Sequence, residues 1–372
     1  MNELDKIEEL SSNSSIDGTP PPSVPECVEE PIDSGKDVSE RPTDANWDIT
    51  EDLSEKEIEE TDIPQISVST QYTQDDYYVL GASLLGRSHL YKEKPCQDYH
   101  VFDDFGDGWH LYIVSDGAGS AKESHRGASA NCNLLLRSVQ KLFQKTDWKE
   151  KGRLPSDLEW HIEFYNLCRG VKGLIESKVE SLDEPVETKD FNATLMLLIV
   201  SPCGMLVGHI GDGRMGYQDL KGNWQSLITP HKGEEANMTV FLMNKWDKPR
   251  IPAMKMAGVY VPETRVVNDI PRKVVVMTDG CENFSWLCLG KDEETGQYVD
   301  RNVPFEGFFQ PLFEAVDKER PNERLETFVT FINSSNEISK SEQDDRTMII
   351  GEYGLQGENS QNIIEGQNHP TI

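Results

Sequence analysis

The sequence predicts an α+β domain built from layers of mostly antiparallel sheet. Short apolar runs that suit strands lie at residues 77–83, 109–115, 193–201, 205–210, 214–219, 273–277 and 347–351. Longer stretches with apolar residues at helical spacing lie at 123–143, 155–182 and 305–332, the last broken near Pro321. These strands and helices come in blocks rather than in strict alternation, which favours α+β over a parallel α/β sheet.

The distribution of charged and polar residues separates a central domain from a polar tail at each end of the chain. The 372 residues carry a net charge of −30, and residues 1–70 alone hold 20 Asp or Glu against four Lys or Arg. A segment this acidic and this poor in aromatic residues buries too little apolar surface to fold. We therefore expect a disordered acidic tail at 1–70, a catalytic domain at 71–353 and a polar tail at 354–372. Within the domain, the proline-containing stretch 227–272 shows little periodicity and is expected to form an irregular lid.

The composition also argues against several partners and compartments. A strongly acidic chain repels nucleic acid and anionic membrane surfaces, because both carry phosphate charge. No stretch reaches the roughly 18 uninterrupted apolar residues of a membrane span, and the first residues lack the basic and apolar regions of a secretory signal. The seven cysteines are odd in number and include no CxxC pair, which favours a reducing compartment. We expect a cytoplasmic protein with no nucleic-acid or membrane partner.

An aspartate stands at the end of one apolar strand after another. In chain order these residues are Asp98, Asp116, Asp212, Asp279, Asp344 and Asp345. Strand ends can converge on one edge of a sandwich, where clustered carboxylates repel each other unless cations neutralise them. Oxygen ligands without Cys or His suit Mg²⁺ or Mn²⁺. Two such ions can bridge a water and orient it for attack on phosphorus.

A single Asp-Gly pair has a simpler interpretation. Asp-Gly is a common turn dipeptide, and we interpret Asp107-Gly108 and Asp17-Gly18 as turns only. What favours a metal centre is the whole ordered set of aspartates, each placed against an apolar strand.

These motifs resemble those of the metal-dependent protein phosphatases, the protein phosphatase 2C family, over about residues 78–351. In order along the chain, the matching pieces are Gln97-Asp98, Asp116-Gly117-Ala118-Gly119, Gly211-Asp212-Gly213-Arg214, Thr278-Asp279-Gly280 and Asp344-Asp345-Arg346-Thr347. The bacterial branch of the family is the most similar. Its Pro-Cys-Gln-Asp motif stands at Pro95–Asp98, its Asp-Gly-Ala-Gly-Ser motif at Asp116–Ser120, and a further match at residues 233–239. The resemblance implies a four-layer α-β-β-α sandwich, with two mostly antiparallel sheets flanked by helix pairs.

The resemblance also implies a role for each acidic residue. Asp116 is expected to bridge two Mn²⁺ or Mg²⁺ ions, and Gly117 to bind through its carbonyl. Asp279 and Asp344 complete the ligands of the first ion, and Asp98 acts one step further out by holding water. Asp212 is the residue associated with a third, weaker ion. The catalytic set is therefore Asp98, Asp116, Asp279 and Asp344.

Three features depart from the family pattern. Gln97 stands where many members have Glu, Ala118 stands where animal members have His, and Asp345 stands where Asn is usual. The last departure implies that a neutral side chain is tolerated at position 345. The family's phosphate-binding arginine has no clean match, and Arg87 and His89 are the nearest candidates. The lid residues expected to contact substrate are Glu234, Asn237 and Thr239.

The implied function is hydrolysis of phosphoserine and phosphothreonine in proteins by attack of a metal-bridged water. A phosphorylated protein is then the substrate, and the acidic tail could dock a cognate kinase or a regulatory protein. A pseudophosphatase, which binds with the same fold but without turnover, is the alternative. The retained Asp116, Asp279 and Asp344 favour the enzyme. An unrelated metal-dependent phosphohydrolase is disfavoured, because no DxD nucleophile motif, HExxH or P-loop signature occurs.

Overall fold

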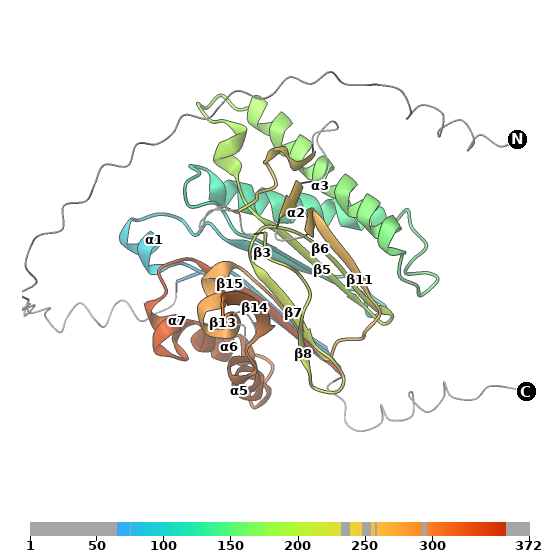
Figure 1. The fold of residues 1–372 in the computed structure, drawn as a ribbon, viewed down its shortest axis with the longest axis vertical. Coiled ribbons are helices and arrows are strands. Elements are labelled where there is room, and N and C mark those ends of the chain that lie inside the picture. Colours follow the sequence, from blue (N-terminus) through green and yellow to red (C-terminus); the bar gives the residue numbers. More distant parts are fainter. Residues whose placement is uncertain are drawn as a thin grey trace, which may run out of the picture. The chain divides into compact units, whose positions relative to one another are not determined.

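Two antiparallel sheets stack face to face in the computed structural model, with helices on both outer faces (Figure 1). The structure describes residues 65–74, 76–231, 239–247, 254–256, 259–291 and 296–354. The six-stranded sheet has the order β1 (Ile66–Thr73), β2 (Tyr77–Leu84), β15 (Arg346–Tyr353), β12 (Lys273–Met277), β7 (Arg214–Gln218) and β8 (Trp224–Ser226). The five-stranded sheet has the order β11 (Glu263–Val267), β6 (Gly204–Ile210), β5 (Leu195–Ser201), β4 (His110–Ser115) and β3 (Tyr99–Asp104). The predicted α+β sandwich is confirmed.

A pair of long helices covers each sheet. The helices α2 (Ser124–Phe143) and α3 (Asp157–Glu180) pack on the five-stranded sheet, and α5 (Glu306–Asp317) and α6 (Arg324–Ser334) pack on the six-stranded sheet. A third apolar layer fills the space between the sheets. This arrangement buries both faces of each sheet, which explains why strands such as β4, β5 and β6 are buried along their whole length.

Local sequence fixes where the long helices begin and how they dock. Ser156 caps α3, because its hydroxyl accepts from the Glu159 amide at 3.2 Å and Glu159 reaches back to the Ser156 amide. The indole of Trp160 donates to the Val207 carbonyl at 2.7 Å, which ties α3 to β6. The hydrogen-bonded cap and the anchored indole set the helix against the sheet.

Shorter elements complete the domain. They are the helices α1 (Arg87–Tyr91), α4 (Glu282–Ser285) and α7 (Glu337–Ser341), the 3₁₀ turns Thr188–Phe191, Lys245–Asp247 and Asp279–Cys281, and two hairpins, β9 (Met254–Met256) with β10 (Val259–Val261) and β13 (Trp286–Lys291) with β14 (Tyr298–Pro304). No helix within the described ranges is long and apolar enough to cross a membrane. None of the six cysteines of those ranges is part of a disulfide.

The structure differs from the sequence expectation in two places: at the start of the domain and within residues 227–272. Strand β1 starts at Ile66, five residues before the expected start of the domain, because backbone pairing with β2 orders a strand whose side chains are largely exposed. The stretch 227–272 is not wholly irregular, since β11 lies inside it and pairs with β6. Glu263 and Arg265 interrupt the apolar run that would have predicted a strand at β11. The expected tails lie outside the described residues, except at 65–70 and Gly354.

Candidate metal centre

Strand register brings three of the predicted aspartates together at one edge of the sandwich. Met277 pairs with Met348 on one side and with Arg214 on the other, so the end of β12 meets the starts of β15 and β7. In the other sheet, the end of β4 and the end of β6 both pair with the start of β5. One carboxylate oxygen each of Asp116, Asp212 and Asp279 lies within 4.8 Å of the other two. The predicted convergence of strand ends is therefore present.

The backbone at Asp116 and Gly117 is held by hydrogen bonds to Thr194 and to Gln97. The Asp116 amide donates to the Thr194 hydroxyl at 2.9 Å, and its carbonyl accepts from the Thr194 amide at 2.7 Å. The Gly117 amide donates to the Gln97 carbonyl at 3.1 Å. A Cβ at position 117 would lie only 2.6 Å from that carbonyl oxygen, so no larger residue fits there. This close approach explains why glycine follows Asp116.

Asp98 is buried beside the cluster and held in one orientation. Its side chain is 3% exposed, and the Thr278 hydroxyl donates to its Oδ2 at 2.8 Å. The same hydroxyl accepts from the Thr347 amide at 3.0 Å, so it cannot turn away from Asp98. The roles of Thr278 and Thr194 were not predictable from the sequence. The only signal was the position of Thr278 directly before Asp279.

Asp344 and Asp345 differ in surroundings. Asp344 is exposed, and its charge helps to raise the pKa of Asp116, Asp279 and Asp98. Asp345 is 2% exposed and accepts hydrogen bonds from the Gly86 and Gln97 amides, both at 2.6 Å. The expectation that a neutral residue would serve at 345 stays a prediction, and these donors argue against it, because they use both oxygens of that carboxylate.

The candidates for phosphate binding occupy different environments. His89 is buried, and its Nδ1 donates to Asp345 Oδ2 at 2.9 Å. Arg87 is exposed at the start of α1. Of the expected lid residues, Thr239 donates a hydrogen bond to Asp212, whereas Glu234 and Asn237 lie outside the described residues.

Crowding of the carboxylates changes their acidity. Burial, followed by the charges of Asp212 and Asp344, raises the pKa of Asp279 to about 7. Burial and the charges of neighbouring aspartates also raise the pKa of Asp116 and of Asp98. Such carboxylates hold protons that a cation can replace. The donor set contains carboxylate oxygens and no Cys or His, so it fits hard divalent ions.

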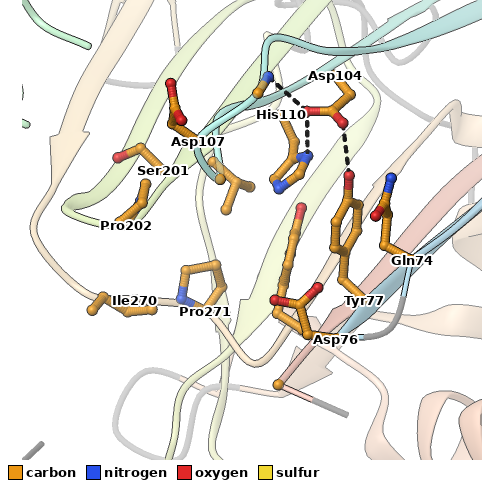
Figure 2. A pocket seen from close by; sticks show the side chains of 15 residues that line it. Gln74, Asp76, Tyr77, Asp104, Asp107, His110, Ser201, Pro202, Ile270 and Pro271 are labelled. Carbon is orange, nitrogen blue, oxygen red and sulfur yellow. Dashed lines mark hydrogen bonds and ion pairs between the residues drawn. The ribbon is translucent and has the colours of Figure 1, made fainter. Parts of the chain in front are cut away.

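A separate cavity lies at the opposite end of the sandwich (Figure 2). It has a volume of about 360 Å³ and is lined by Tyr77, His110 and Pro271 among others. Strand β4 starts with His110 in this cavity and ends beside Asp116, so the cavity and the aspartates are a strand length apart. None of Asp116, Asp212 and Asp279 lines this cavity, so the cavity is not part of the candidate metal centre.

The fold and the site together define a class: a divalent-metal-dependent hydrolase built on a four-layer α+β sandwich. Comparison with known proteins narrows this class. A sequence model of the family described as protein phosphatase 2C matches residues 85–330. Serine/threonine-protein phosphatase 3 of Escherichia coli (strain K12) is 28% identical over 276 residues, which cover 72% of this chain and 95% of that protein.

Two solved protein phosphatase structures are also similar to this chain, both with TM-scores below 0.5. A serine-threonine phosphatase 2C from Toxoplasma gondii has a TM-score of 0.47 at 13% identity, covering 78% of this chain and 100% of that chain. The serine/threonine phosphatase Stp1 from Staphylococcus aureus has a TM-score of 0.45 at 9% identity, covering 79% of this chain and 100% of that chain. On the match of the family model, the chain belongs to the protein phosphatase 2C family and is a phosphoprotein phosphatase.

Proposed function

We propose that this chain removes phosphate from phosphoserine and phosphothreonine in protein substrates, using two Mn²⁺ or Mg²⁺ ions. The observation that carries the proposal is the convergence of Asp116, Asp212 and Asp279 from both sheets in a chain of this family. The printed name of the Escherichia coli relative, a serine/threonine-protein phosphatase, supports the choice of substrate residues.

The proposed ligands are those that the family resemblance implies. Asp116 and the Gly117 carbonyl would hold both ions, and Asp279 and Asp344 would be further ligands of the first. Asp212 would hold a third, weaker ion. When bound, the ions supply an activated water and offset charge on the phosphoryl oxygens.

The chain's own residues position the reaction. Asp98, fixed by Thr278, orients water at the centre through hydrogen bonds. Ala118 offers no proton, so solvent protonates the departing serine or threonine oxygen. Arg87 is the proposed phosphate contact, since His89 is engaged by Asp345 and we assign it to placing α1 instead.

A pseudophosphatase is not favoured. A chain that only binds has no need of these carboxylates, whose burial and mutual repulsion raise the pKa of Asp116 and Asp279 at a cost to stability. From the sequence alone we also propose a cytoplasmic location, and a kinase or regulatory protein as the partner of residues 1–70.

Release of phosphate from a phosphothreonine peptide tests the function. We expect turnover in Mn²⁺ or Mg²⁺ that EDTA abolishes and that fresh Mn²⁺ restores. Undiminished turnover in EDTA would refute the metal mechanism. Binding of the peptide without turnover in any of these ions would support the pseudophosphatase.

A further inference from the structure

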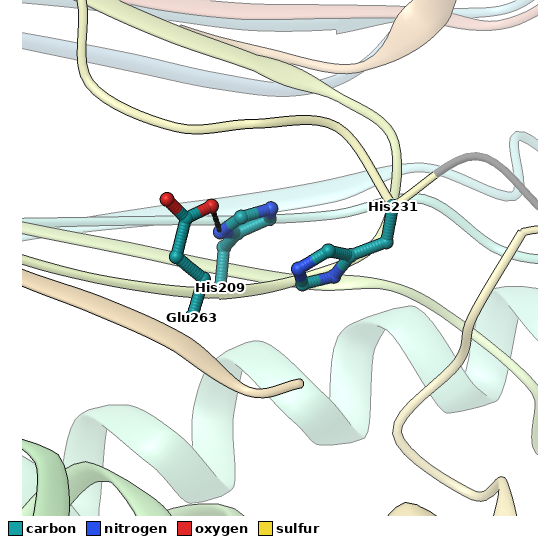
Figure 3. Close-up of side chains that lie close together, drawn as sticks. All are labelled: His209, His231 and Glu263. Atoms are coloured by element: carbon teal, nitrogen blue, oxygen red, sulfur yellow. Dashed lines mark ion pairs between the residues drawn. The ribbon is translucent and has the colours of Figure 1, made fainter. Parts of the chain in front are cut away.

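A second group of metal-ligating side chains lies apart from the aspartates (Figure 3). His209 stands near the end of β6, Glu263 begins β11, and His231 follows β8 by a few residues. One ligand atom of each lies within 4.8 Å of the other two. The two histidines are 0% exposed and the glutamate is 7% exposed.

His209 presents a lone pair to this group. Its Nε2 donates to the Thr229 carbonyl at 3.1 Å, which leaves Nδ1 of the neutral ring without a proton. That nitrogen lies 3.4 Å from Glu263 Oε2 and makes no hydrogen bond within the described part of the chain. A lone pair that faces a carboxylate oxygen in a buried site is unfavourable unless a cation lies between them.

His231 adds an unpartnered nitrogen. Its Nε2 is buried with no hydrogen-bond partner among the described residues, and Figure 3 shows the ring beside the side chains of His209 and Glu263. The two imidazole rings stack, with centroids 4.1 Å apart. Burial lowers the pKa of His231 to about 4 and that of His209 well below its usual value. Both rings are therefore neutral near pH 7, the state that binds metals.

Both oxygens of the Glu263 carboxylate are held by hydrogen bonds. The Thr229 amide donates to its Oε2 at 2.9 Å, and the Arg265 guanidinium donates to its Oε1 at 2.7 Å. Thr229 therefore holds both His209 and Glu263, one through its carbonyl and the other through its amide. Partners of this kind outside the ligand set orient metal-binding imidazoles and carboxylates.

We propose that His209, His231 and Glu263 bind one divalent transition-metal ion, with Zn²⁺ as the expected species. Two imidazoles and one carboxylate form a ligand set that suits Zn²⁺, with a further position open to water. The carboxylate-only centre instead suits harder ions, so the two sites select different metals. This site is independent of the proposed phosphatase function.

Binding requires small adjustments at the His231 end. Metal–ligand bonds of about 2.0–2.2 Å need the three atoms to draw closer than they now lie. The Gly211 amide contacts His231 Nδ1 at 3.2 Å, so the proton of the free ring is on Nε2. Coordination through Nε2 moves that proton to Nδ1, where it would face the Gly211 N–H, so the His231 ring must also turn away from Gly211.

Zinc binding to the full chain tests the site. Protein freed of metal is placed in excess Mg²⁺, which occupies the carboxylate centre, and Zn²⁺ is titrated against a chromophoric chelator. We expect one tightly bound Zn²⁺ per chain. His231→Gln should weaken its affinity by at least about 100-fold. The control Asp116→Asn, which alters only the carboxylate centre, should bind Zn²⁺ like the parent.

Three outcomes overturn the proposal. They are no stoichiometric Zn²⁺ binding, binding that survives in His231→Gln, and binding that is lost in Asp116→Asn. Circular dichroism of His231→Gln without metal checks that it folds. Should it fail to fold, X-ray absorption of Zn²⁺-loaded parent protein decides. Two imidazoles in the zinc shell support the site, and a shell of oxygen alone refutes it. Neither readout uses phosphatase activity, so failure here leaves the proposed function standing.

Discussion

Asp345 shows how a charged side chain can serve the fold beside a reactive centre. Its two oxygens accept from the Gly86 amide, the Gln97 amide and His89, which together join three loops at the edge of the sandwich. Its neighbour Asp344 is exposed, and its charge contributes to the raised pKa of Asp116 and Asp279 in the acidic cluster. Adjacent residues near a strand point to opposite sides, which separates the two roles.

Substituting each of these aspartates with asparagine should separate stability from metal binding. An amide at position 345 turns an NH₂ group toward backbone donors, so Asp345→Asn should lower the free energy of unfolding by about 1–3 kcal/mol or more. Asp344→Asn is the matched control. It should change stability by less than about 0.5 kcal/mol but weaken Mn²⁺ binding. Urea denaturation in EDTA and calorimetric Mn²⁺ titration measure the two effects. A stable Asp345→Asn variant would contradict this assignment.

The sequence allows some site residues to be predicted and hides others. Asp116, Asp212 and Asp279 were predictable because each follows an apolar run, and strand ends can meet. The orienting role of Thr278 was not, because it depends on a contact with a residue 180 positions away. The cluster of His209, His231 and Glu263 was also missed. It has no sequence motif and requires that β11 be recognised as a strand.

Among the elements, the hairpin of β13 and β14 depends on one buried arginine. The Arg214 side chain is 0% exposed. It donates to Asn302 Oδ1 at 2.9 Å, to Asp300 Oδ2 at 2.8 Å and to Glu282 Oε2 at 2.9 Å. These contacts join β7 to both the hairpin and α4. Arg214 is therefore held in ion pairs with both Glu282 and Asp300.

Removing the Arg214 guanidinium should lower the free energy of unfolding by more than removing one partner of a surface ion pair does. Arg214→Met leaves Glu282 and Asp300 without their buried partner, and we expect a loss of about 3–5 kcal/mol in unfolding free energy. Arg301→Met, on the exposed part of the same hairpin, is the matched control, with an expected change within about 0.5 kcal/mol. Urea denaturation of both variants measures the difference. Equal effects would mean that Arg214 does not anchor the hairpin.

Elements with a strong apolar pattern were predictable, and those held by backbone pairing were not. The strands β2, β4, β5 and β6 lie close to their predicted ranges, because each is buried on both faces. In contrast, β1 alternates between exposed and half-buried residues, and its order comes from pairing with β2. Such pairing leaves little trace in composition.

At the scale of the whole molecule, buried neutral histidines make the fold sensitive to acid. His100 is 1% exposed and is hydrogen-bonded to Ser83 at 2.8 Å and Thr70 at 3.2 Å. Burial lowers its pKa to about 3, whereas the unfolded chain has a histidine pKa near 6.5. Between these values the unfolded state binds more protons, so stability falls as the pH falls.

Comparison with His100→Gln isolates this effect from that of the carboxylates, whose raised pKa values act in the opposite direction. Glutamine keeps a polar side chain but does not titrate. We expect the parent to lose about 1.4 kcal/mol more stability per pH unit than the variant between about pH 6 and pH 4. Urea denaturation across this range, in EDTA, gives both slopes. Parallel slopes would show that His100 does not remain neutral in the folded protein.

We expect the carboxylates at one end of the sandwich to be required for hydrolysis of phosphoserine and phosphothreonine. Initial rates of phosphate release from a phosphothreonine peptide in Mn²⁺ test it most directly, with Asp116→Asn set against Asp107→Asn. Both positions precede a glycine, but Asp107 lies in an exposed turn at the opposite end of the sandwich. We predict that Asp116→Asn reduces phosphate release to background in a folded protein, while Asp107→Asn keeps the parent rate. Parent-level release by folded Asp116→Asn would contradict the account.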